Sequence, residues 1–162
     1  MSNFDIEKIA NHYNINVIIV MKDELKNMKP INKNYIIKDG NGTHWMGLKI
    51  GNKDWVYFDS YGMLPPEEII SFCKRIPKSH LAYNTKEIQD LNAQTCGYFA
   101  MAFLIFLNNN NDDNNVFKKS SSFSNLFSLE TKINNKKLQE FYRYLPTASP
   151  NLQILNKLYR QK

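Results

Sequence analysis

The sequence predicts an α+β fold in which a mixed central β-sheet is flanked by helices, with a candidate nucleophilic cysteine at the N-terminus of the central helix. Short runs of β-branched and aromatic residues, separated by turn residues, predict the strands. The most apolar segment, residues 96–107, predicts a buried helix, and apolar residues at helical spacing predict flanking helices. With 162 residues, of which 43% are hydrophobic and 13% aromatic, the chain is expected to form a single domain over residues 1–162.

The chain is expected to open with a helix and to continue into strands. Apolar residues recur at helical spacing over 4–13, and Ser2 or Asn3 is the candidate N-cap. The β-branched run 17–20 predicts a strand, and so does the run 35–37. These elements supply one edge of the expected sheet.

A β-hairpin follows. Residues 44–50 predict a strand, and the turn residues 51–54 lead into the aromatic strand 55–59. His44 begins one arm of this hairpin and Asp59 ends the other. The two side chains are therefore expected to meet at the open end of the hairpin.

The second half of the chain is expected to be mainly helical. Pro65 and Pro66, followed by two glutamates, predict a helix start, because proline and acidic residues both suit the first turn. An Asn/Asp tract at 108–115 predicts an exposed loop. The other expected elements are a helix ending near residue 75, a short strand at 81–84, the buried helix at 96–107 and two helices at 136–144 and 152–159.

Composition narrows the classes of protein. Two cysteines cannot form a disulfide framework, and the first ten residues lack the apolar core of a signal peptide, so the protein is not expected to be secreted. The apolar run 98–107 is too short to cross a bilayer, so no membrane association is expected.

The net charge of +6 is spread along the chain, which favours a solvated lysine surface over a nucleic-acid site. No zinc-type cysteine pairs and no glycine-rich phosphate loop occur, so neither a metal nor a cofactor is expected.

Cys96 is the candidate nucleophile. It stands where a polar loop enters the apolar helix, and backbone N–H groups at a helix N-terminus lower the pKa of a thiol. Gly97 would let a substrate backbone approach the sulfur closely. The alternative is a buried structural cysteine.

His44 and Asp59 supply the expected base and its orienting carboxylate, because a carboxylate beside an imidazole fixes its tautomer and stabilises its charged form. An oxyanion donor is also needed. Gln89 and Gln94 both precede Cys96, and their spacing alone does not choose between them.

The strings GTHW, WVYFDSYG and QDLNAQTCGYFAMAFL carry these residues in order, and over residues 42–107 the chain resembles the adenovirus-type (adenain-like) cysteine proteinases of the Ulp-like clan, which also occur in virophages and Polinton-type elements. The resemblance implies that the oxyanion donor is Gln89. It also makes Trp45 a wall of the substrate channel, with core packing as the alternative. Asp59 replaces the glutamate of adenoviral enzymes. Cys73 does not match the family's peptide-linked cysteine, so covalent activation by a peptide is not expected.

The resemblance implies a viral cysteine endopeptidase that processes capsid or core precursors during virion maturation, at glycine-containing sites. It would act as a monomer in the virion and the host cytoplasm, and the basic charge leaves stimulation by DNA open. The alternatives are a deubiquitinase- or SUMO-protease-like enzyme, an acetyltransferase using the same residues, and an inactive binding module.

Overall fold

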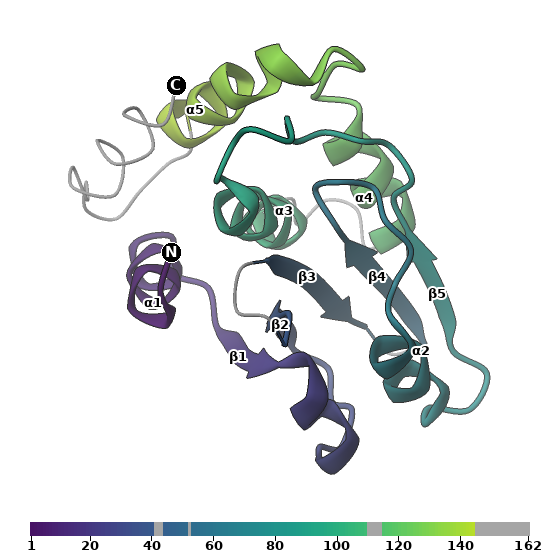
Figure 1. Ribbon diagram of the computed structural model, residues 1–162. Coiled ribbons are helices and arrows are strands. Elements are labelled where there is room, and N and C mark those ends of the chain that lie inside the picture. Colours follow the sequence, from purple (N-terminus) through teal and green to yellow (C-terminus); the bar gives the residue numbers. More distant parts are fainter. Residues whose placement is uncertain (41–43, 52, 110–114, 145–162) are drawn as a thin grey trace.

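The computed structural model describes residues 1–40, 44–51, 53–109 and 115–144. Its elements, shown in Figure 1, are α1 (Asn3–His12), β1 (Val17–Met21), the 3₁₀ helix η1 (Lys22–Asn27), β2 (Asn34–Lys38), β3 (Trp45–Ile50), β4 (Asp54–Phe58), α2 (Glu67–Lys74), β5 (His80–Tyr83), α3 (Cys96–Asn109), α4 (Val116–Ser124), the 3₁₀ helix η2 (Thr131–Ile133) and α5 (Asn134–Tyr144). None of the helices in this part of the chain has the length and apolar character needed to cross a membrane.

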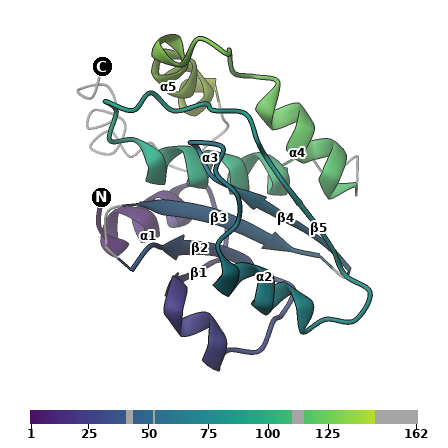
Figure 2. The ribbon, with the colours of Figure 1, turned by 45° about the vertical axis from the view of Figure 1, so that its right-hand side comes forward.

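The five strands form one mixed sheet in the order β1-β2-β3-β4-β5. The outer pairs, β1 with β2 and β4 with β5, are parallel, whereas β2, β3 and β4 run antiparallel to one another. Helices flank both faces of the sheet: α1, α3, α4 and α5 cover one face, and α2 with η1 covers the other (Figure 2). The predicted α+β fold with a mixed sheet between helices is confirmed.

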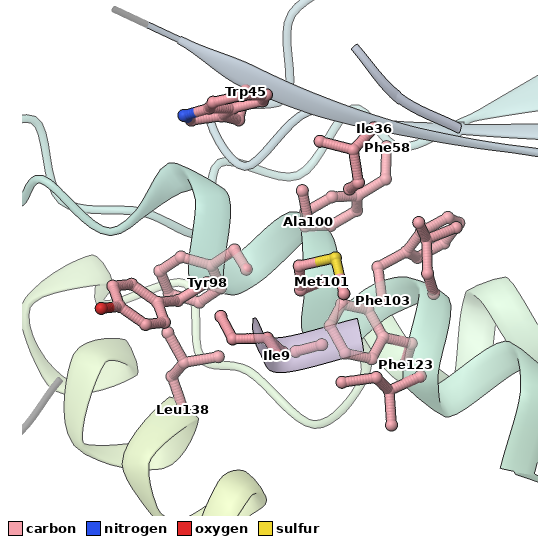
Figure 3. Packing of buried hydrophobic residues seen from close by; sticks show 14 of the residues in the cluster. Ile9, Ile36, Trp45, Phe58, Tyr98, Ala100, Met101, Phe103, Phe123 and Leu138 are labelled. Carbon is pink, nitrogen blue, oxygen red and sulfur yellow. The ribbon is translucent and has the colours of Figure 1, made fainter. Parts of the chain in front are cut away.

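Successive side chains of a strand point to opposite faces of the sheet, and apolar side chains on both faces form two separate hydrophobic cores. On β4, Val56 and Phe58 pack against α3, while Trp55 and Tyr57 pack toward α2. The α3 core contains stacked aromatic rings, among them Phe58 and Phe103 with centroids 4.9 Å apart (Figure 3).

The helix that carries Cys96 lies directly on β3. Close approach is possible because Gly47 has no side chain: a methyl group there would lie 3.3 Å from the Phe103 ring and 3.5 Å from the Ala100 carbonyl oxygen. Helix α3 is almost wholly apolar and buried. Its N-terminus is thereby fixed beside the start of β3, where His44 lies.

Most of the predicted elements are present with small shifts at their ends. Ser2 is the N-cap of α1, and β3 begins at Trp45, one residue later than expected. The expected exposed loop at 108–115 is wrong in part, because α3 continues to Asn109 and the half-buried Asn108 donates from Nδ2 to the Leu104 carbonyl oxygen at 2.6 Å. Residues 110–114 and the expected helix at 152–159 lie outside the described residues.

Helix α4 was not expected from the sequence. Asn115 caps it, because its Oδ1 accepts hydrogen bonds from the backbone N–H groups of Phe117 and Lys118. The helix packs on the sheet through Phe123, which is fully buried against Phe58 and Phe103.

Candidate active site

His44 and Asp59 are in contact at the open end of the β3–β4 hairpin. His44 directly precedes β3 and Asp59 directly follows β4, and the antiparallel register brings the two ends together. The distance from His44 Nε2 to Asp59 Oδ1 is 2.9 Å. Asp59 is 3% exposed, so this contact is shielded from water. The contact expected across the hairpin is present.

Asn84 holds Asp59 in place. Its Oδ1 accepts a hydrogen bond from the Asp59 N–H at 2.9 Å, and its Nδ2 donates to the Asp59 carbonyl oxygen at 2.6 Å. The carboxylate is fixed as well, because Oδ1 of Asp59 accepts from the Tyr61 N–H at 2.9 Å. The acid is therefore oriented before any ligand binds.

Cys96 is the first residue of α3 and is hydrogen-bonded to the side chain of His44. Since Nε2 of His44 faces Asp59, the other ring nitrogen, Nδ1, is left for the sulfur. Burial raises the pKa of the Cys96 thiol, but the hydrogen bond to His44, the backbone N–H groups of Trp45 and Gly97 and the charge of His44 bring the pKa below its ordinary value.

The charge balance of the pair favours an imidazolium beside a thiolate. Burial lowers the pKa of His44, whereas the hydrogen bonds to Asp59 and Cys96 and their negative charges raise it, with a net result of about 9. A lowered thiol pKa beside a raised imidazole pKa is the state required of a cysteine nucleophile.

Gln89 is fully buried, and three hydrogen bonds fix its amide group. Ser60 Oγ donates to Oε1 at 2.6 Å, which directs Nε2 toward the carbonyl oxygen of Ala93 at 2.7 Å and toward Tyr61 Oη at 3.2 Å. Gln94, the rival oxyanion donor, is exposed. The structure therefore connects Gln89 to the His44 neighbourhood through Tyr61.

Trp45 is both a core residue and a neighbour of the reacting groups. It is 2% exposed, and Lys38 Nζ lies 5.0 Å from the centroid of its ring. Its Cδ1 atom lies 3.2 Å from the position that a methyl group on Gly97 would take. Trp45 and Gly97 thus border one narrow space beside Cys96.

Sequence reasoning missed three residues of this site: Ser60, Tyr61 and Asn84. Tyr61 stacks on His44 from the turn that follows β4, two residues after Asp59, and no sequence signal marks it. Asn84 follows β5, and no sequence signal pairs it with Asp59. The second cysteine, Cys73, lies in the core under the other face of the sheet, and burial raises its pKa to about 12.

Comparison with known proteins supports the fold. No protein-family model matches the chain, and no curated protein matches it. Among solved structures, the chain shares its α+β fold with a protease. That structure is the crystal structure of the ASFV pS273R protease, which is 16% identical, aligns with 89% of this chain and 66% of its own, and has a TM-score of 0.54. The chain therefore spans slightly less than two thirds of that protease.

Proposed function

We propose that the protein is a cysteine endopeptidase. Cys96 is the nucleophile, His44 is the base and acid, Asp59 orients His44, and Gln89 acts with the Cys96 N–H as the oxyanion donor. One observation carries the proposal: His44 contacts a buried carboxylate through one ring nitrogen and hydrogen-bonds to a thiol at a helix N-terminus.

The proposed reaction proceeds through an acyl-enzyme. The Cys96 thiolate attacks the scissile carbonyl carbon, and the carbonyl oxygen becomes an oxyanion. The His44 imidazolium then gives its proton to the leaving amine, the C–N bond breaks, and a thioester remains on Cys96. Neutral His44 next takes a proton from water, whose oxygen attacks the thioester, and the carboxylic acid leaves as the thiolate–imidazolium pair is restored.

The oxyanion role of Gln89 requires an exchange of partners. Both N–H bonds of its amide are engaged, the shorter one with Ala93 and the longer one, at 3.2 Å, with the hydroxyl of Tyr61. The longer hydrogen bond is the weaker one. The N–H that points to Tyr61 is therefore the one available to a developing oxyanion.

The biological setting is proposed from the adenain-like motifs together with the viral protease that shares the fold. The substrates would be capsid or core precursors, cleaved during virion maturation in the virion and the host cytoplasm by a monomeric enzyme. Cleavage at glycine-containing sites fits the close approach of the Trp45 ring to Gly97, which leaves little room beside Cys96. The net charge of +6 allows DNA to stimulate the reaction through non-specific attraction.

Peptide cleavage tests the proposal. The wild-type protein and a Cys96→Ala variant are incubated with a library of Gly-Gly peptides, with matched Val-Val peptides, and with acetyl-CoA plus lysine peptides. We expect cleavage of Gly-Gly peptides by the wild type alone. Transfer of acetyl groups without peptide cleavage would contradict the proposal, and so would equal cleavage by Cys96→Ala. Co-expression with the capsid precursor of the same genome would then map the new N-termini.

A further inference from the structure

The side chain of Met1 fills the space beside the candidate nucleophile. A methyl group built on Gly97 would collide with the sulfur of Met1 and lie close to its terminal methyl group. The ring of Trp45 borders the same space. Met1 is partly buried there and packs against the core that contains Trp45 and Tyr98.

The position of Met1 is fixed by the cap of α1. Ser2 forms a capping box with Asp5: the Asp5 N–H donates to Ser2 Oγ at 3.2 Å, and the Ser2 N–H donates to Asp5 Oδ2 at 2.8 Å. Helix α1 is itself anchored by Ile6 and Ile9, which are fully buried against the α3 core. The residue before the cap therefore leaves the helix in a defined direction, toward α3.

The space occupied by Met1 lies next to the two proposed reacting residues. Gly97 follows Cys96 and Trp45 follows His44, so a group held between Gly97 and Trp45 lies beside both reacting residues. A peptide whose carbonyl carbon reaches the Cys96 sulfur comes close to this space, because Gly97 is bonded directly to Cys96. An unbranched, flexible methionine side chain can fill such a narrow gap and can also leave it, because few of its atoms are held by directional bonds.

We propose that Met1 plugs the substrate channel of the free protein and must leave before a peptide can bind. The inference rests on the proposed peptidase function, because it assigns a regulatory contact to the same site. It makes the N-terminal segment an autoinhibitory element, and it predicts that any event that removes or displaces the Met1 side chain activates the enzyme.

The first test measures the accessibility of Cys96 and needs no substrate. The wild type, Met1→Ala and Phe4→Ala are each produced behind the same cleavable tag, which leaves one identical glycine before residue 1. Phe4 is a matched control, because it lies in the first turn of α1 and is 61% exposed. Alkylation by iodoacetamide at pH 6 is followed by mass spectrometry of the peptide that contains Cys96. We expect Met1→Ala to react several-fold faster than the wild type and Phe4→Ala to match the wild type. Equal rates for Met1→Ala and the wild type would overturn the proposal.

The second test separates this inference from the proposed function. In peptide cleavage, Met1→Ala should show a several-fold lower KM with little change in kcat, since the plug competes with substrate and takes no part in bond breaking. Faster alkylation of Met1→Ala without cleavage by any of the three proteins would contradict the peptidase function and support the plug. Cleavage by all three with identical alkylation rates and identical KM would contradict the plug and support the peptidase. A Met1→Leu variant, which restores an apolar side chain of similar size, should return both readouts toward the wild type.

Discussion

Tyr61 stacks on the imidazole ring of His44, with ring centroids 5.1 Å apart and planes inclined by 29°. Its hydroxyl also accepts the hydrogen bond from Gln89 Nε2 at 3.2 Å. One side chain therefore contacts the proposed base with its ring and the proposed oxyanion donor with its hydroxyl. The two contacts can be tested in turn, because Tyr61→Phe removes the hydroxyl and keeps the ring, whereas Tyr61→Leu removes both.

Tyr61→Phe should change turnover without moving the pH profile. The phenyl ring keeps the contact with His44, whereas the lost hydroxyl frees the Gln89 amide. Tyr61→Leu removes the aromatic face that stabilises a charged imidazole, so its upper pH limb should move to lower pH. Initial cleavage rates between pH 5 and 10 compare the two variants. Identical pH profiles for Tyr61→Leu and the wild type would show that the stack does not stabilise the charged ring.

Asp59→Asn should narrow the pH range of activity from its alkaline side. In the wild type, the hydrogen bond and charge of Asp59 help to raise the pKa of His44 to about 9, so the imidazolium that protonates the leaving amine persists until the pH rises past that value. Without the carboxylate the pKa of His44 falls, and activity should be lost at lower pH. The acidic limb follows the lowered pKa of Cys96. An unchanged alkaline limb of kcat/KM in Asp59→Asn would contradict this assignment.

Gln89→Ala should lose about 10²–10³-fold in turnover, as is typical when one oxyanion donor is removed. The KM should change far less, because the donor acts mainly in the transition state. Alkylation of Cys96 should persist, since the His44 contact remains. Gln94→Ala is the matched control, because Gln94 is exposed, and it should retain turnover. A turnover loss confined to Gln94→Ala would transfer the role to that residue.

Cys96→Ala should abolish cleavage while changing the free energy of unfolding by no more than about 2 kcal/mol, because the lost sulfur is small. Cys73→Ala should keep activity, since Cys73 lies under the opposite face of the sheet. Thermal unfolding and peptide cleavage of both variants provide the check. Loss of activity in Cys73→Ala at unchanged stability would disprove the assignment.

The strands and the His44–Asp59 contact could be predicted because local signals determine them. The antiparallel register pairs Gly47 with Phe58, so His44, which precedes β3, and Asp59, which follows β4, lie at the same end of the hairpin. The position of Cys96 at the start of a helix could also be predicted, since a polar loop that enters an apolar run marks a helix start.

What could not be predicted depends on contacts between distant segments. Helix α4 is polar along most of its length, and its cap at Asn115 stands inside a tract that resembles a loop. Asn84 reaches Asp59 only because β5 pairs with β4. Met1 meets Gly97 because α1 packs on α3, and no local pattern in the sequence encodes that packing.

The central claim is that Cys96 and His44 form a thiolate–imidazolium pair. The most direct measurement is the rate of Cys96 alkylation by iodoacetamide as a function of pH, in the wild type and in His44→Ala. The alkylation rate of the wild type should reach its maximum at a lower pH than that of His44→Ala, because the pKa of its thiol is lowered, whereas His44→Ala should react only as the pH approaches the ordinary thiol value of about 8.5. A wild-type rate that rises only near that ordinary value, in parallel with His44→Ala, would contradict the account.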